Sequence, residues 1–161
     1  MRKRAGWFVI VATGLLVVMM LGATYVAGSQ ENRFTVLMTG AQEVPPADPD
    51  GAAKADLSLD VTNGEVCFDI KLEAVGTPNR GHIHFAPPGT NGGIVVPFFE
   101  LAATPADPRH DELENGRIQD CVSADPAALG LIVASPHLYY VNLHNARFPG
   151  GAVRGQLSPA P

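Results

Sequence analysis

Two histidines separated by one residue, His82 and His84, occur in the segment GHIHF, and a third, His144, follows in YYVNLH. Side chains two residues apart lie on the same face of a β-strand, so His82 and His84 share one face. Neutral imidazoles are common ligands of copper and zinc, and three of them leave a fourth coordination position open. A shared ion requires the three imidazoles to approach within roughly 5 Å of one another.

The same histidines also have a structural interpretation. Paired histidines on strands often hydrogen-bond to neighbouring loops, and the segment PPGTNGG and Asn142 are candidate partners here. Glu43, in the segment EVPP, is expected to pair with an arginine, for which Arg80, Arg147 and Arg154 are candidates. The residue types therefore indicate a metal site or a hydrogen-bonded sheet surface.

Alternation of apolar and polar residues predicts the strands that position these groups. In KADLSLDV, Ala55, Leu57 and Leu59 share one face, and the Asn63-Gly64 pair then predicts a hairpin into a second alternating run, EVCFDIKLE. The runs RFTVLMTG, GHIHF, GGIVVPFFEL, GRIQDCVSA, HLYYVNLH and GGAVRGQL predict further strands. About eight short strands with close turns predict an all-β fold, an antiparallel Greek-key sandwich or barrel.

One helix is predicted, over residues 125–134. Asp125 is its expected N-cap, Pro126 occupies the first helical position, and Pro136 ends it. The segment 102–115, AATPADPRHDELEN, is rich in proline and acidic residues and is predicted to be an exposed loop. Residues 158–161 are predicted to form a flexible C-terminal tail.

The N-terminal residues predict export from the cytoplasm. Arg2, Lys3 and Arg4 precede an uncharged apolar run that extends to about residue 28. Small residues at Val26 and Gly28 suit cleavage of a signal peptide after Gly28, whereas the length of residues 5–28 also suits an uncleaved transmembrane anchor. Both interpretations of residues 1–28 place the rest of the chain outside the cell or on the outer face of the membrane.

The charge of the exported part bears on its partners, and its cysteines bear on a disulfide. Without Arg2, Lys3 and Arg4, eight of the eleven basic residues remain against sixteen acidic ones, so the exported part is acidic and nucleic acid is not an expected partner. The two cysteines, Cys67 and Cys121, both follow the export segment. In an oxidising compartment an even count most simply indicates one disulfide, and two buried free thiols are the alternative.

Three motifs in order resemble the CHRD domain, a family named after chordin. They are LMTGAQEVPP, GHIHFAPPGTNGGIVVPF and SPHLYYVNLHNARFPGGAVRGQL, and the resemblance covers residues 34–157. It implies an extracellular, all-β module of immunoglobulin-like or barrel-like form, and it implies no established reaction.

A second, local similarity concerns the histidines. A His-x-His strand, a later strand ending in histidine and a C-terminal strand carrying Arg154 are similar to the copper strands of copper/zinc superoxide dismutase. This similarity implies that His82, His84 and His144 hold copper and that Arg154 steers small anions. The chain lacks the bridging histidine and the zinc ligands of that enzyme, so zinc binding of the dismutase kind is not implied.

These observations lead to two functional hypotheses. The first is an exported CHRD-like module that binds an unidentified extracellular protein or glycan or has a structural role, and that is not an enzyme. The alternative is a copper- or zinc-binding protein, dismutase-like in its chemistry, that uses His82, His84 and His144.

Overall fold

A computed structural model of the chain describes residues 32–101 and 107–161. The strands of these residues are β1 Asn32–Thr39, β2 Ala52–Asp60, β3 Glu65–Glu73, β4 Pro78–Phe85, β5 Gly93–Glu100, β6 Arg117–Ser123, β7 Tyr139–Asn145, β8 Val153–Gln156 and β9 Ser158–Pro159. The helices are α1 Arg109–Glu114 and α2 Pro126–Ala134, with short 3-10 turns η1 Gly40–Gln42 and η2 Pro136–Leu138.

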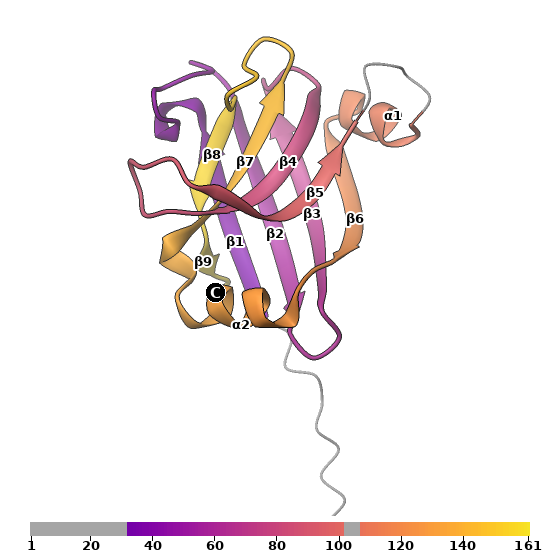
Figure 1. Cartoon of the computed structure of the whole chain (residues 1–161). Coiled ribbons are helices and arrows are strands. Elements are labelled where there is room, and N and C mark those ends of the chain that lie inside the picture. The colour runs from indigo at the N-terminus through magenta and orange to yellow at the C-terminus, as the bar shows by residue number, and fades with distance from the viewer. Residues whose placement is uncertain (1–31, 102–106) are drawn as a thin grey trace, which may run out of the picture.

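All of the strands belong to one antiparallel sheet. Its order is β5-β4-β7-β8-β1-β2-β3-β6, and β9 pairs with β1 outside this path. The sheet curls until β5, at one edge, contacts β6, at the other (Figure 1). The result is a nearly closed barrel, which confirms the predicted all-β antiparallel class.

The interior of the barrel contains the apolar residues that the alternation predicted. Ala55, Leu57 and Leu59 of β2 and Val66 and Phe68 of β3 are all buried in one core. The predicted hairpin between these strands is present, and Gly64 adopts a left-handed φ of 66° in its turn. Because side chains alternate along each strand, burial of one face sends the polar face of the same strands outward.

The helices confirm one prediction and correct another. Asp125 caps α2, where its carboxylate accepts a hydrogen bond from Ala127 N at 2.9 Å. In the segment 102–115, predicted to be an exposed loop, residues 102–106 lie outside the described ranges, and Arg109–Glu114 form α1. Asp111 and Glu112 lie in the first turn of α1, where negative charge is favourable, and Leu113 is buried in the core. Leu113 therefore packs α1 against the core, although the composition of this segment indicated a loop.

The C-terminus corrects the prediction of a flexible tail. Ser158 and Pro159 of β9 pair with Thr35 and Phe34 of β1, and Ala160 N donates to Arg33 O at 3.0 Å. Along the edge of β1 that faces away from β2, β8 pairs with β1 only at Thr39, so the first half of β1 has backbone groups that β9 satisfies.

Within the two described ranges no helix is long and apolar enough to cross a membrane. The predicted signal peptide or anchor, residues 1–28, lies outside them.

A disulfide joins Cys67 of β3 to Cys121 of β6, as predicted. The two residues face each other directly in the register of these antiparallel strands. The bond closes a sequence separation of 54 residues and holds β6, an edge strand, to the rest of the sheet. The alternative of free thiols is therefore excluded.

Removal of this disulfide is expected to lower the free energy of unfolding by about 2–4 kcal/mol, because the unfolded chain regains the entropy of a long loop. Urea unfolding of a Cys67→Ala/Cys121→Ala double variant measures this effect. The intact mass of the unreduced protein should also be about 2 Da below that of the reduced form. A double variant as stable as the parent would show that the bond does not constrain the sheet.

Candidate metal centre

The candidate site lies on the outer face of three adjacent strands, β4, β7 and β8. In their register His82 is opposite Asn142, and Asn142 is opposite Arg154, so these three residues form one row across the strands. His84 is opposite Tyr140 in the neighbouring row. The alternation that buries Ile83 and Val141 in the core places these polar side chains together outside it.

The structure brings the three predicted histidines together. One ring nitrogen from each of His82, His84 and His144 lies within 4.8 Å of those of the other two. The ring centroids are 5.4 Å apart for His82 and His84 and 5.1 Å apart for His82 and His144. Because metal–nitrogen bonds are about 2.0–2.1 Å long, small side-chain rotations would allow one ion to bind all three nitrogens.

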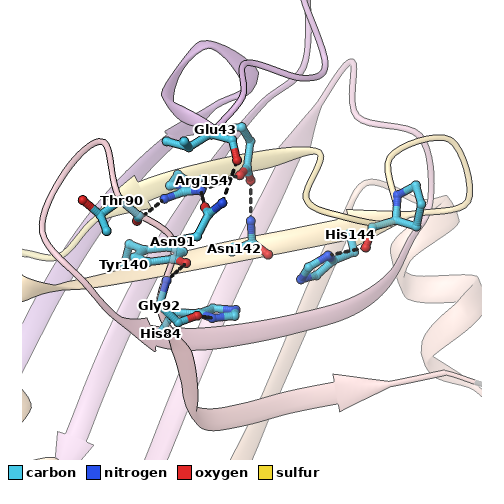
Figure 2. Close-up of polar contacts among 11 residues, drawn as sticks. Glu43, His84, Thr90, Asn91, Gly92, Tyr140, Asn142, His144 and Arg154 are labelled. Atoms are coloured by element: carbon cyan, nitrogen blue, oxygen red, sulfur yellow. Dashed lines mark hydrogen bonds and ion pairs between the residues drawn. The ribbon is translucent and has the colours of Figure 1, made fainter.

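Hydrogen bonds through Nδ1 leave Nε2 of His84 and of His144 without a protein partner. The Nδ1 atoms of His84 and His144 lie 3.0 Å from the carbonyl oxygens of Gly92 and Pro149 and donate to them (Figure 2). This tautomer places a lone pair on each Nε2 atom, and both Nε2 atoms are buried without a partner. His82 Nδ1 is likewise buried and unpartnered. A ligand histidine typically makes such a hydrogen bond through its other nitrogen.

Three loops cover this outer face and bury it. The loop after β4 contributes Gly92, the loop between β7 and β8 contributes Pro149, and the loop after β1 contributes Glu43 (Figure 2). The imidazoles of His82, His84 and His144 are consequently no more than 8% exposed. The three histidines therefore lie outside the apolar core but not on an open surface.

A buried ion pair fastens two of these loops. The Nε and Nη2 atoms of Arg154 donate to Glu43 Oε2 at 3.1 and 3.0 Å, which identifies Arg154 as the arginine partner expected for Glu43. The same guanidinium donates to Thr90 O at 2.9 Å and to the side-chain oxygen of Asn91 (Figure 2). These contacts position the loop that carries Gly92. The steering of anions by Arg154 stays a prediction.

Tyr140 links the ion pair to the histidines. Its ring stacks on that of His84 with a centroid distance of 4.9 Å, and the guanidinium of Arg154 lies over the tyrosine ring at 4.3 Å. The Tyr140 hydroxyl accepts a hydrogen bond from Gly92 N at 3.2 Å. His84 is therefore held by stacking on one face and by the Gly92 carbonyl at its edge.

The surroundings favour neutral imidazoles. Burial, helped by the neighbouring His144, His84 and Arg80, lowers the pKa of His82 to about 4. Burial also lowers the pKa of His84 and of His144, although their hydrogen bonds to Gly92 and Pro149 partly oppose this change. Metal ligation requires neutral imidazole, so the site is in its ligating protonation state at neutral pH.

These shifts predict how the stability of the metal-free protein depends on pH. In the unfolded chain the histidines bind protons near the ordinary pKa of 6.5, and in the folded chain they bind them only at lower pH. Their contribution to the free energy of unfolding is therefore fully present above about pH 6.5 and is lost as the pH falls below this value, for His82 down to about pH 4. Each of the three histidines contributes up to about 1.4 kcal/mol per pH unit. Urea unfolding in the presence of a chelator, between pH 7.5 and 5, measures this dependence.

A His82→Asn variant isolates the contribution of one ring, because it removes a titrating group from the buried cluster. Glu43 acts in the opposite direction, since burial raises its pKa, and the comparison of parent and variant cancels its effect. A variant with the same pH dependence as the parent would contradict the depressed pKa of His82.

The second group of potential ligands does not form a metal site of this kind. Glu65 lies close to Cys67 and Cys121, but the two sulfurs are joined in the disulfide and offer no thiolate. The hydrogen bond of His84 to Gly92 agrees with the expected contact between the histidines and the segment PPGTNGG. The sequence did not indicate Tyr140 or the Pro149 carbonyl as parts of the histidine site. The parity that places Tyr140, Asn142 and His144 on one face was the available signal for Tyr140.

Comparison with known proteins agrees with the resemblance of the motifs. The model of the CHRD domain family matches residues 34–157 of this chain. The match includes the three histidines, Glu43, Tyr140 and Arg154. No curated protein and no solved structure matches the chain significantly.

Proposed function

From the premise that the chain belongs to the CHRD domain family, we propose that its barrel binds a single copper or zinc ion through His82, His84 and His144. The observation that carries the proposal is the convergence of three buried imidazoles: one ring nitrogen of each lies within 4.8 Å of those of the other two, and each ring has a buried nitrogen without a partner. Buried polar atoms in proteins are almost always paired with protein, water or a ligand, and a metal ion is a partner that all three imidazoles can share.

The chemistry of the donors supports a transition metal as that partner. Three neutral nitrogens suit copper and zinc, whereas calcium and magnesium require oxygen ligands. In the described part of the chain, no carboxylate or thiolate joins this group of ligands. An ion with three protein ligands keeps a fourth position for water or another small ligand.

The structural interpretation of the histidines is compatible with this proposal. His84 and His144 each use Nδ1 to hold a covering loop, and the lone pair on Nε2 remains available. One nitrogen therefore serves the fold and the other serves the ion, which is the usual division in metal-binding histidines.

We further propose that the domain functions after export. The Cys67–Cys121 disulfide supports this placement, because such bonds persist in oxidising compartments. An extracellular protein or glycan partner, the first hypothesis from the sequence, stays a prediction.

The proposal is tested by the metal content of the full chain, purified without a histidine tag. We expect about one equivalent of copper or zinc after loading and dialysis, measured by plasma mass spectrometry. Ligand-dependent stabilisation is a second readout, and a free metal concentration 100 times the dissociation constant should add about 2.7 kcal/mol to the free energy of unfolding. Substoichiometric metal without stabilisation would restrict the histidines to a structural role.

A further inference from the structure

A further buried polar atom without a partner belongs to a residue that is directly opposite His82 in the strand register. It is Oδ1 of Asn142, a residue whose side chain is only 2% exposed. An amide oxygen has two lone pairs and can only accept hydrogen bonds. The inference below rests on the proposed metal site, because it concerns the ligand at the fourth position of the ion.

The strand register places the Asn142 amide among the histidines. Asn142 is directly opposite His82 in the pairing of β7 with β4, and side chains in such pairs have Cβ atoms about 4.5–5.5 Å apart. His144 lies two residues further along β7 and therefore on the same face. The amide thus adjoins two of the three candidate ligands.

The orientation of the amide is fixed by charge. Asn142 Nδ2 donates to Glu43 Oε1, and a carboxylate cannot donate in return, so the amide nitrogen must face Glu43. Glu43 is itself held by Arg154 through its other oxygen. The amide oxygen consequently points away from Glu43, and Figure 2 shows it on the side of Asn142 that faces His144.

Gly151 keeps this contact tight. A Cβ atom at this position would lie 2.6 Å from both Asn142 Nδ2 and Glu43 Oε1, and the residue has a φ of 140° that favours glycine. The loop between β7 and β8 therefore packs directly on the Asn142–Glu43 pair at Gly151, where a larger residue would displace it.

We propose that Asn142 Oδ1 accepts a hydrogen bond from the ligand at the fourth position of the metal, and that this ligand is a proton donor, namely water or a molecule with a coordinating O–H or N–H group. An anion without a proton would face the lone pairs of the amide oxygen instead. Asn142 is then a specificity-determining residue that favours water over such anions, and Glu43 and Arg154 are positioning residues that hold its amide.

The test uses the full chain loaded with Co²⁺, whose visible spectrum reports the fourth ligand, and azide as the protonless anion. In Asn142→Leu the acceptor is replaced by an apolar side chain of similar size. We expect its affinity for azide to exceed that of the parent by about 3- to 10-fold, the equivalent of one hydrogen bond, with Co²⁺ affinity nearly unchanged. Gln156→Leu is the matched control, because that amide donates to the carbonyls of Ala86 and His137 and should leave azide affinity unchanged.

Each other outcome has a defined meaning. Unchanged or weaker azide binding by Asn142→Leu would overturn the assignment. A loss of Co²⁺ affinity of more than about 100-fold in a folded variant would also overturn it, because a residue that only orients a ligand contributes less and Asn142 would then be a ligand itself. Failure of the parent to bind any metal would instead refute the metal site, which distinguishes the two proposals.

A second measurement does not depend on the folding of a variant. On loading the unsubstituted protein with Zn²⁺, the side-chain carbonyl ¹³C resonance of Asn142 should shift as it gains a hydrogen bond. The resonance of Asn145, whose oxygen already accepts from Phe148 N at 2.8 Å, should change less. An unshifted Asn142 signal in the loaded protein would contradict the proposal.

Discussion

Replacing His84 with alanine is expected to lower the affinity of the protein for copper or zinc by about 100-fold or more, since even residues that only orient a ligand commonly contribute 10- to 100-fold. The variant removes one of three donors and also the ring that stacks on Tyr140 and donates to Gly92. Two remaining imidazoles form a much weaker site, because an ion bound there must take solvent in two positions. Isothermal titration in competition with a chelator measures the change.

The chain provides a matched control for this substitution. His137 lies in the 3-10 turn before β7, is exposed, and is not one of the clustered histidines. His137→Ala should therefore bind copper or zinc with the affinity of the parent. Equal losses of metal affinity in His84→Ala and His137→Ala would indicate binding by scattered surface histidines. Unchanged metal affinity in both variants would show that the ion binds elsewhere.

Replacing Glu43 with alanine is expected to lower the free energy of unfolding by about 3–5 kcal/mol, because it leaves the Arg154 guanidinium buried and without its carboxylate. Both side chains are less than 5% exposed, and Arg154 lies over Tyr140 in the layer beneath the loops. The same variant frees the amide of Asn142 and loosens the loop that carries Gly92. Urea unfolding of the chelated protein measures the stability change separately from any effect on metal binding.

An exposed ion pair serves as the control for the buried pair of Glu43 and Arg154. Lys54 and Asp56 form a 2.7 Å pair on β2, but both side chains are more than 40% exposed. Solvent screens such pairs, so Lys54→Ala should change stability by no more than about 1 kcal/mol. If Glu43→Ala were equally mild, the ion pair with Arg154 would not anchor the loops.

Local sequence was sufficient to predict most of the fold. Alternation over residues 54–61 and 65–73 predicted the strands, their buried faces and the hairpin, because a period of two directly reflects the geometry of a half-buried strand. Asp125 and Pro126 marked the start of α2 because capping is a local interaction. Helix α1 and strand β9 were missed because Leu113 and the edge of β1 dock them through contacts distant in sequence.

Local sequence likewise predicted only part of the candidate site. The spacing of His82 and His84, and the parity of Tyr140, Asn142 and His144, follow from the strand repeat alone. Which arginine pairs with Glu43 did not follow, since Arg154 is 111 residues away in sequence and three arginines were eligible.

The sequence by itself therefore determined which side chains share a face, because that property depends on the backbone repeat of each strand. Only the tertiary structure decided that β4, β7 and β8 are neighbours and that three loops close over them. Strand order and loop packing arise from long-range pairing and burial, which a local pattern does not encode. Those long-range contacts turn three histidines on two strands into one buried cluster with three unpartnered nitrogens.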